Sequence, residues 1–227
     1  MPGVPNNPVP KPTRDTRRGG TRRRYRTCRK ADQSLLNQVM ERSLSRDVLT
    51  RAARALDILE GNVVLFEGEE EMPILFDFAM HDLRSRGKNA FERYRDTVGP
   101  ASPLEAEILD AHAAATTSLF EVISTSPTDD TVLVDDVLVE RDDVRITDVQ
   151  LSRSAVPGML LFLRPVVTAE FTITSGMMLA FPGSLVLDVL AGYRRRSRRP
   201  IAERDPRQRF LYFYRLHLAF GVGVGYR

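Results

Sequence analysis

The pattern of apolar residues changes near Ser118, and this change limits the possible folds more than any other feature of the sequence. Before it, apolar residues recur at helical spacing, most clearly between Leu35 and Leu59. After it, short runs rich in Val, Ile, Leu and Phe are separated by turn residues. The sequence therefore predicts an α+β fold, in which an N-terminal helical region packs on a small antiparallel β meander or SH3-like barrel, with disordered basic ends.

The clearest local signal is a helix start at Ser102. Ser102 can cap the helix, Pro103 fits the first helical position, and Glu105 can complete a capping box. From these patterns we divide the chain into four segments: a disordered Pro/Arg-rich arm (1–31), a helical region (32–118), a small β unit with a closing helix (119–193), and a basic then aromatic tail (194–227).

Charge divides the chain in a second way. Residues 1–30 carry ten Lys and Arg against one acidic residue, residues 31–193 carry 13 against 27, and residues 194–227 carry ten against two. The formal net charge of +3 is thus the average of an acidic body and two basic ends. The acidic body should repel phosphates, whereas the ends should attract them.

We expect the basic ends to bind nucleic acid or another polyanion. Arginine dominates both ends, and its planar guanidinium makes bidentate contacts with phosphate. The alternatives are that the ends fold back on the acidic body, or that they only promote solubility. The candidate nucleic-acid-binding residues are Arg17, Arg18, Arg22, Arg23, Arg24, Arg26, Arg29, Lys30, Arg194, Arg195, Arg196, Arg198 and Arg199.

The single cysteine, Cys28, excludes an internal disulfide and fits a reducing compartment, so we expect a cytoplasmic protein. No apolar run is long enough to span a membrane. Because Arg26, Arg29 and Lys30 flank Cys28 in an arm expected to be exposed, its thiolate should be favoured and its thiol easy to label.

Aromatic residues cluster between Phe210 and Phe220, directly after the Arg-rich stretch. A basic segment followed by an aromatic one is compatible with contact at an anionic membrane interface by residues 210–224. A buried C-terminal strand or helix is the alternative.

Catalytic chemistry has few candidate residues. A metal-dependent hydrolase would have to be built from His81, Asp82 and His112, and it would need further ligands. Neither a Walker pattern nor a dinucleotide fingerprint occurs. We therefore predict no cofactor, no metal and no catalytic residue, and an enzyme is the less favoured interpretation.

Several segments resemble an uncharacterised bacterial family over about residues 55–192: "GKNAFERY", "PLEAEIL" and "LSRSAVPGMLLFLR" follow one another in the same order. The resemblance implies a helical region followed by a small β unit and assigns no activity. Our first interpretation is thus a non-enzymatic binding or adaptor protein that contacts a polyanion through its basic ends. A protein–protein interaction module that uses the acidic core or the β unit, and the metal-dependent hydrolase, are the alternatives.

Overall fold

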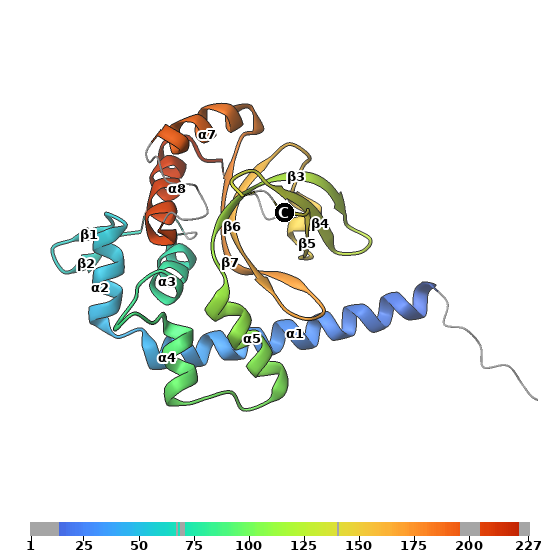
Figure 1. Ribbon diagram of the computed structural model, residues 1–227, viewed down its shortest axis with the longest axis horizontal. Coiled ribbons are helices and arrows are strands. Elements are labelled where there is room, and N and C mark those ends of the chain that lie inside the picture. The colour runs from blue at the N-terminus through green and yellow to red at the C-terminus, as the bar shows by residue number, and fades with distance from the viewer. Residues whose placement is uncertain (1–13, 67, 69–70, 140, 196–204, 223–227) are drawn as a thin grey trace, which may run out of the picture.

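A small closed β-barrel lies beside a layer of helices in the computed structural model of the chain (Figure 1), which describes residues 14–66, 68, 71–139, 141–195 and 205–222. The helices are α1 (Arg14–Ser43), α2 (Arg46–Ala55), α3 (Glu71–His81), α4 (Ala90–Thr97), α5 (Pro103–Ala114), α6 (Leu151–Ser154), α7 (Val186–Arg195) and α8 (Pro206–Phe220), with the 3-10 turn η1 (Gly183–Leu185). The strands are β1 (Leu59–Glu60), β2 (Val63–Val64), β3 (Ser118–Ser126), β4 (Thr131–Asp136), β5 (Val144–Thr147), β6 (Leu160–Val167) and β7 (Thr172–Phe181).

Strands β3 to β7 close into a five-stranded barrel in the order β3-β4-β5-β7-β6. All pairs are antiparallel except the closing one, where β5 meets β7 in parallel through Ile146 and Thr172. The barrel interior is filled by side chains such as Phe120, Val134 and Leu161. The predicted α+β class, with a small barrel beside a helical region, is confirmed.

Two further apolar cores lie between the barrel and the helices. One joins α2, α3, α7 and α8 to the outer face of β6 and β7, and the other joins α1, α4 and α5 to the ends of the same strands. Strand β6 is therefore buried on both faces: Leu161 points into the barrel, whereas Phe162 packs on Phe210 and Phe213 of α8. This double burial explains why β6 is almost continuously apolar.

The predicted helix start at Ser102 is confirmed. The Ser102 side chain accepts a hydrogen bond from the Glu105 backbone at 3.2 Å, and Pro103 opens α5. The Glu105 carboxylate bonds to the backbone N–H of Ala101 instead of Ser102, at 3.2 Å. A reciprocal capping box does occur at α4, between Asn89 and Glu92.

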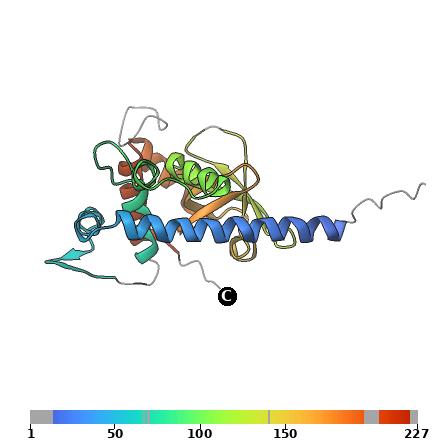
Figure 2. The same cartoon turned by 90° about the horizontal axis from the view of Figure 1, so that it is seen from below.

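The expected disorder of residues 1–31 is wrong for the part of the arm that the structure describes. Residues from Arg14 onward form the N-terminal half of α1, the first turns of which extend past the barrel (Figures 1 and 2). Tyr25 and Cys28 are buried, and Tyr25 packs edge-on against Phe171 at a ring distance of 5.7 Å. This apolar contact offsets the entropy of ordering the arm.

The C-terminal aromatic segment forms α8, and its first two turns place aromatic side chains in the protein core, whereas Phe220 at its end is exposed. Phe210, Phe213 and Tyr214 are at most 1% exposed. A membrane-interface role for residues 210–224 is therefore wrong for these side chains, which the barrel and α7 already cover, and residues 223–224 lie outside the described residues. Among the helices that the structure describes, none combines the length and apolarity needed to cross a bilayer.

Candidate nucleic-acid interface

The two predicted basic segments lie far apart. Helix α1 runs along one side of the molecule, and α7, which ends at Arg195, lies on the opposite side (Figure 1). Arg194 and Arg195 are exposed at the end of α7. The side chain of Arg17 and all of Arg196, Arg198 and Arg199 lie outside the described residues. Among the described residues, the predicted nucleic-acid-binding side chains thus lie close to one another only along α1.

Several arginine side chains of α1 point inward, toward the acidic turns of the barrel. Three pairs join the helix to the β unit: Arg18 with Asp129, Arg22 with Asp130, and Arg24 with Glu170. The Asp130 pair is bidentate, with contacts of 2.7 Å from Nε and 3.1 Å from Nη2 of Arg22. The hydrogen bond to Asp130 raises the pKa of Arg22, so this guanidinium stays charged.

Arg29 also turns inward. Its Nη1 donates to the Asp32 carboxylate at 2.9 Å and to the backbone carbonyl of Thr174 at 3.2 Å. These bonds fix the Arg29 side chain between α1 and β7. Arg29 is therefore a structural residue of the helix–barrel contact, and its charge is already compensated by Asp32.

A second face of α1 points away from the protein and remains basic. Arg23, Arg26 and Lys30 are all exposed, and none has an ion-pair partner among the described residues. Their spacing of three and four residues places them on one side of the helix, over a length of about 10 Å. Together they form what we call the outward basic face, defined as Arg23, Arg26 and Lys30.

Two glycines adjoin the outward basic face. A Cβ added at Gly19 would meet no atom within 4 Å, and one at Gly20 would meet only the end of the Arg24 side chain at 3.8 Å. The helix backbone is therefore uncovered at this point. The sugar-phosphate backbone of a nucleic acid has room to approach the helix here, and three cations in line match a run of phosphates.

The expected exposure of Cys28 is wrong. The thiol lies on the inward side of α1 and its residue is 4% exposed. Burial raises its pKa, the Asp32 carboxylate raises it further, and Arg29 opposes the shift only in part. The flanking basic residues that were expected to favour the thiolate mostly point elsewhere, because successive helix residues face different directions.

A buried ionic network, which we call the Arg164 network, was missed in the sequence. Arg164 on β6 is 1% exposed, and its guanidinium bonds to Asp77 on α3 at 2.9 and 3.1 Å, to Asp82, and to the carbonyl of Ala115 at 3.0 Å. Burial disfavours the Asp77 carboxylate, yet Arg164 outweighs it and holds the pKa of Asp77 below its usual value. For Asp82 burial dominates and its pKa is raised, since one guanidinium offsets only part of two buried carboxylates.

Two histidines extend this network toward α1. His81 Nδ1 lies 3.0 Å from the Asp77 carbonyl, His81 Nε2 lies 3.1 Å from His112 Nδ1, and His112 Nε2 lies 2.7 Å from Asp32. Because a carbonyl only accepts, His81 Nδ1 donates to it; in a neutral ring His81 Nε2 then accepts from His112 Nδ1, and His112 Nε2 donates to the Asp32 carboxylate. Burial and the nearby Arg164 charge hold the pKa of His81 well below its usual value, which agrees with a neutral ring.

The hydrogen bonds of His81, Asp82 and His112 occupy the groups that a hydrolase metal would need. The two imidazoles bond to each other, and Asp82 bonds to Arg164. Within the described residues, no three His, Cys, Asp or Glu side chains are arranged to hold a metal ion. What these residues do here is join α3, α5, β6 and α1 across the helix–barrel boundary.

A signal for the network was present in the sequence. Arg164 is a lone charge in the apolar run "LLFLRPVV", and Asp77 is a lone acid in "ILFDFAM". A charge in a segment that must be buried needs a partner of opposite sign. The pairing itself depends on the fold, which brings together residues 87 positions apart.

Comparison with known proteins gives one match. A family model described as "Family of unknown function (DUF7986)" matches residues 20–227, which extends the expected resemblance over residues 55–192 into both basic ends. No curated protein and no solved structure matches the chain.

Proposed function

Because the chain belongs to the DUF7986 family, whose function is unknown, we propose its function from its surfaces: it is a non-enzymatic binding protein that contacts nucleic acid through the outward basic face of α1. The observation that carries this proposal is that Arg23, Arg26 and Lys30 remain exposed and unpaired among the described residues, although neighbouring arginines pair with the barrel. We also keep a cytoplasmic location as part of the proposal, on the basis of the single cysteine.

The inward pairs support the proposal physically. They hold the helix against the barrel, so the outward cations sit on an ordered scaffold and lose less entropy when they bind than a disordered arm would. Contacts to phosphate by three side chains on one helix face carry little base preference. We therefore expect binding that depends on salt more than on sequence.

The experiment is fluorescence anisotropy with labelled duplex and single-stranded oligonucleotides over a range of salt concentrations. The test variant is R23Q/R26Q/K30Q. The matched control is R42Q/R145Q/R153Q, which removes the same charge from exposed positions outside the outward basic face. Since each phosphate contact adds ~0.9 to the slope of log K against log salt, the test variant should lose about 2.7 from this slope on duplex.

The control should keep most of the wild-type slope. Equal losses in the two variants would mean that only net charge matters, and would refute the outward basic face as the site. Absence of binding by wild-type protein at low salt would refute the proposal as a whole.

The two alternatives from the sequence stay predictions. For a protein–protein module, the acidic turns at Asp129, Asp130 and Glu170 are already engaged by α1, so a basic partner would have to use other acidic side chains of the β unit. For a metal-dependent hydrolase, the His81–His112 hydrogen bond would have to break before either nitrogen could bind a metal.

A further inference from the structure

A cleft lined by arginines lies away from the outward basic face. It has a volume of about 740 Å³ and is bounded by α2, the end of α3, the start of α4, the end of α5 and the start of α8, with β6 at its floor. Figure 1 shows that α2, α3 and α4 lie at the end of the molecule opposite the projecting turns of α1. We call it the arginine cleft, with Arg51, Arg54, Arg84 and Arg207 at its rim.

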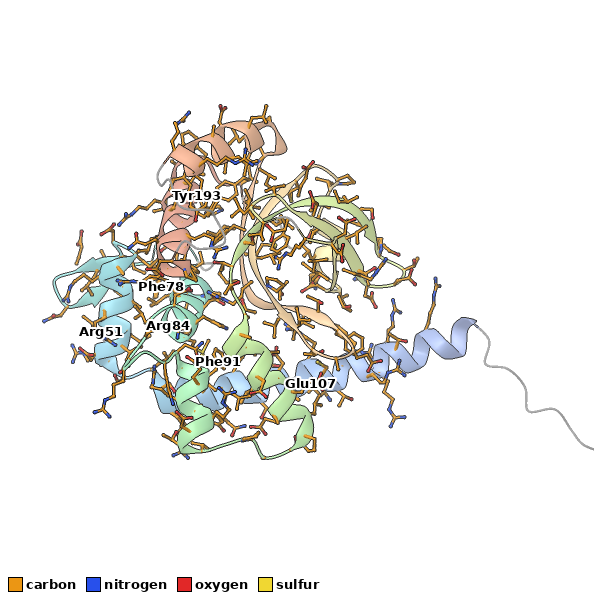
Figure 3. The ribbon with its side chains drawn as sticks, in the orientation of Figure 1. Arg51, Phe78, Arg84, Phe91, Glu107 and Tyr193 are labelled. Atoms are coloured by element: carbon orange, nitrogen blue, oxygen red, sulfur yellow. The ribbon has the colours of Figure 1, made fainter. Side chains whose placement is uncertain are left out.

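The rim arginines come from separate elements and are exposed. Arg51 and Arg54 lie on α2, Arg84 follows α3, and Arg207 lies in the first turn of α8. Arg51 and Arg84 are labelled in Figure 3, on the same side of the molecule. Guanidinium groups from three directions can therefore surround a single ligand.

Their charge is only partly neutralised. Arg51 pairs with Asp47 at 3.4 Å, and both side chains are exposed, where such a pair adds little. Arg84, which is exposed, pairs at 3.2 Å with the half-buried Glu92. Arg54 and Arg207 have no ion pair among the residues that the structure describes. The Asp205 carboxylate, which also lines the cleft, accepts from the Arg207 backbone N–H at 3.0 Å as the cap of α8.

Arg93 on α4 lies close enough to Arg51 to be affected by its charge. The pKa of Arg93 on α4 is lowered, first by partial burial and then by repulsion from Arg51. Its guanidinium donates to the carbonyl of Lys88, at 3.0 Å, and no acidic side chain pairs with it in the described part of the chain. Arg93 is thus a cation beside Arg51 that no carboxylate pairs with among the described residues.

The floor of the cleft is rigid and polar. It is formed by the edges of His81, Asp82 and Arg164, which belong to the Arg164 network and are nearly fully buried. Apolar lining comes from Leu83 and from small side chains such as Ala55, and no Phe, Tyr or Trp is among the lining residues described. The imidazole of His81 is nearly fully buried and is hydrogen-bonded through both ring nitrogens. The cleft therefore offers guanidinium groups but no exposed Phe, Tyr or Trp ring on which a nucleobase could stack.

We infer that the arginine cleft binds a compact ligand with two or more linked phosphate groups, of which inorganic pyrophosphate and tripolyphosphate are the simplest. Guanidinium groups bind phosphate oxygens in bidentate fashion, and several linked phosphates satisfy several arginines at once. The volume is in the range of small-molecule sites. The lack of a Phe, Tyr or Trp side chain among the described lining residues favours phosphate chains over nucleotides.

The experiment is isothermal titration calorimetry of the full chain with sodium tripolyphosphate, pyrophosphate and orthophosphate in low-salt buffer. The test variant is R54Q/R207Q, which removes the two rim charges that have no ion pair among the described residues and breaks no side-chain hydrogen bond seen within them. The matched control is R145Q/R153Q, which removes the same charge from exposed positions of the β unit. Thermal unfolding without ligand verifies that both variants fold like the wild type.

We expect saturable binding of one tripolyphosphate per chain, at least about tenfold weaker binding of orthophosphate, and at least about tenfold weaker tripolyphosphate binding by R54Q/R207Q. The control should bind as the wild type does. No saturable binding, or equal weakening in the control, would overturn the inference. ATP binding more than tenfold tighter than tripolyphosphate would overturn the assigned ligand class.

The outcome is independent of the proposed nucleic-acid contact. The variant R23Q/R26Q/K30Q should keep its affinity for tripolyphosphate, because its three positions lie on α1 and do not line the arginine cleft. Loss of tripolyphosphate binding in this variant would place the anion site on α1 and overturn the inference, whatever the oligonucleotide assay shows.

Discussion

Replacing Arg164 tests the buried network most directly. The substitution Arg164→Met keeps an unbranched apolar chain in β6 and removes the guanidinium. Asp77 and Asp82, which are 3% and 7% exposed, then lose their main donor, and the Ala115 carbonyl loses a bond of 3.0 Å. Two buried carboxylates remain without a cation within bonding distance.

The expected cost follows from the burial of these groups. Removing one partner of a buried ion pair typically destabilises a protein by about 3–5 kcal/mol, because the other charge stays in a low-dielectric site. Whole proteins unfold with ~5–15 kcal/mol, so Arg164→Met should fold but with much less stability. For a chain of this length, the melting temperature should fall by roughly 6–20 °C.

The pH dependence identifies the cause. Without Arg164, burial raises the pKa of both carboxyls in the folded state, so the folded protein binds protons that the unfolded chain releases. Stability linked to such groups increases as the pH falls toward 5. In urea titrations, the deficit of Arg164→Met relative to wild type should therefore be smaller at pH 5 than at pH 7.

The control is Arg153→Met, at an exposed position, which should change the free energy of unfolding by less than about 0.5 kcal/mol. The combination R164M/D77N/D82N removes both orphaned charges and should recover part of the loss. A deficit of Arg164→Met below about 1 kcal/mol at pH 7, or a deficit that grows at pH 5, would refute the reasoning.

Further predictions concern α1 and His81. Cys28 should react slowly with a thiol reagent in native buffer and rapidly in urea, because burial raises its pKa; equal rates would contradict its place in the core. Gly19→Ala and Gly20→Ala should each raise the free energy of unfolding by about 0.5–1 kcal/mol, measured by urea titration, since both are helical and have room for a Cβ; a decrease would contradict the helix. Below pH 6.5 His81 binds a proton in the unfolded chain but not in the folded one, so the free energy of unfolding should decrease as the pH falls. In His81→Gln, the slope of the unfolding free energy against pH should be smaller by up to ~1.4 kcal/mol per pH unit.

Elements that depend on local chemistry were predictable from the sequence. Ser102 and Pro103 fix a helix start through bonds made within one turn, and the apolar strand runs fix the β unit because each must be covered on at least one face. The aromatic residues of the barrel region, such as Phe120 and Phe162, are core residues.

Elements that depend on distant partners were not predictable in the same way. Arg164 meets Asp77 and Asp82 only because β6 packs on α3. The arginine cleft likewise assembles residues from α2 to α8, and no local pattern marks Arg54 and Arg207 as neighbours. Sequence reasoning identified charge along the chain, but the position of charge in space depends on how the elements pack.

The N-terminal arm lies between these two cases. Its arginine content, and glycines at positions 19 and 20, favoured disorder. Yet Tyr25, Cys28, Leu35 and Val39 repeat with the spacing of one helix face, which continues the apolar stripe of the following segment back into the arm. The many arginines between these apolar residues made the stripe hard to recognise. A helix that packs on an acidic surface can carry arginine on both sides of its apolar face.

The structure also changes how the basic arm must be tested. Deleting residues 1–30 would remove Arg23 and Arg26 from the surface, and it would also remove Tyr25 and Cys28 from the core and uncover Phe171. Loss of nucleic-acid binding by such a truncation would then report either lost contacts or lost folding. Substitutions confined to the outward basic face avoid this ambiguity, since those side chains have no ion pair to the body in the described structure and their removal leaves the inward contacts of α1 in place.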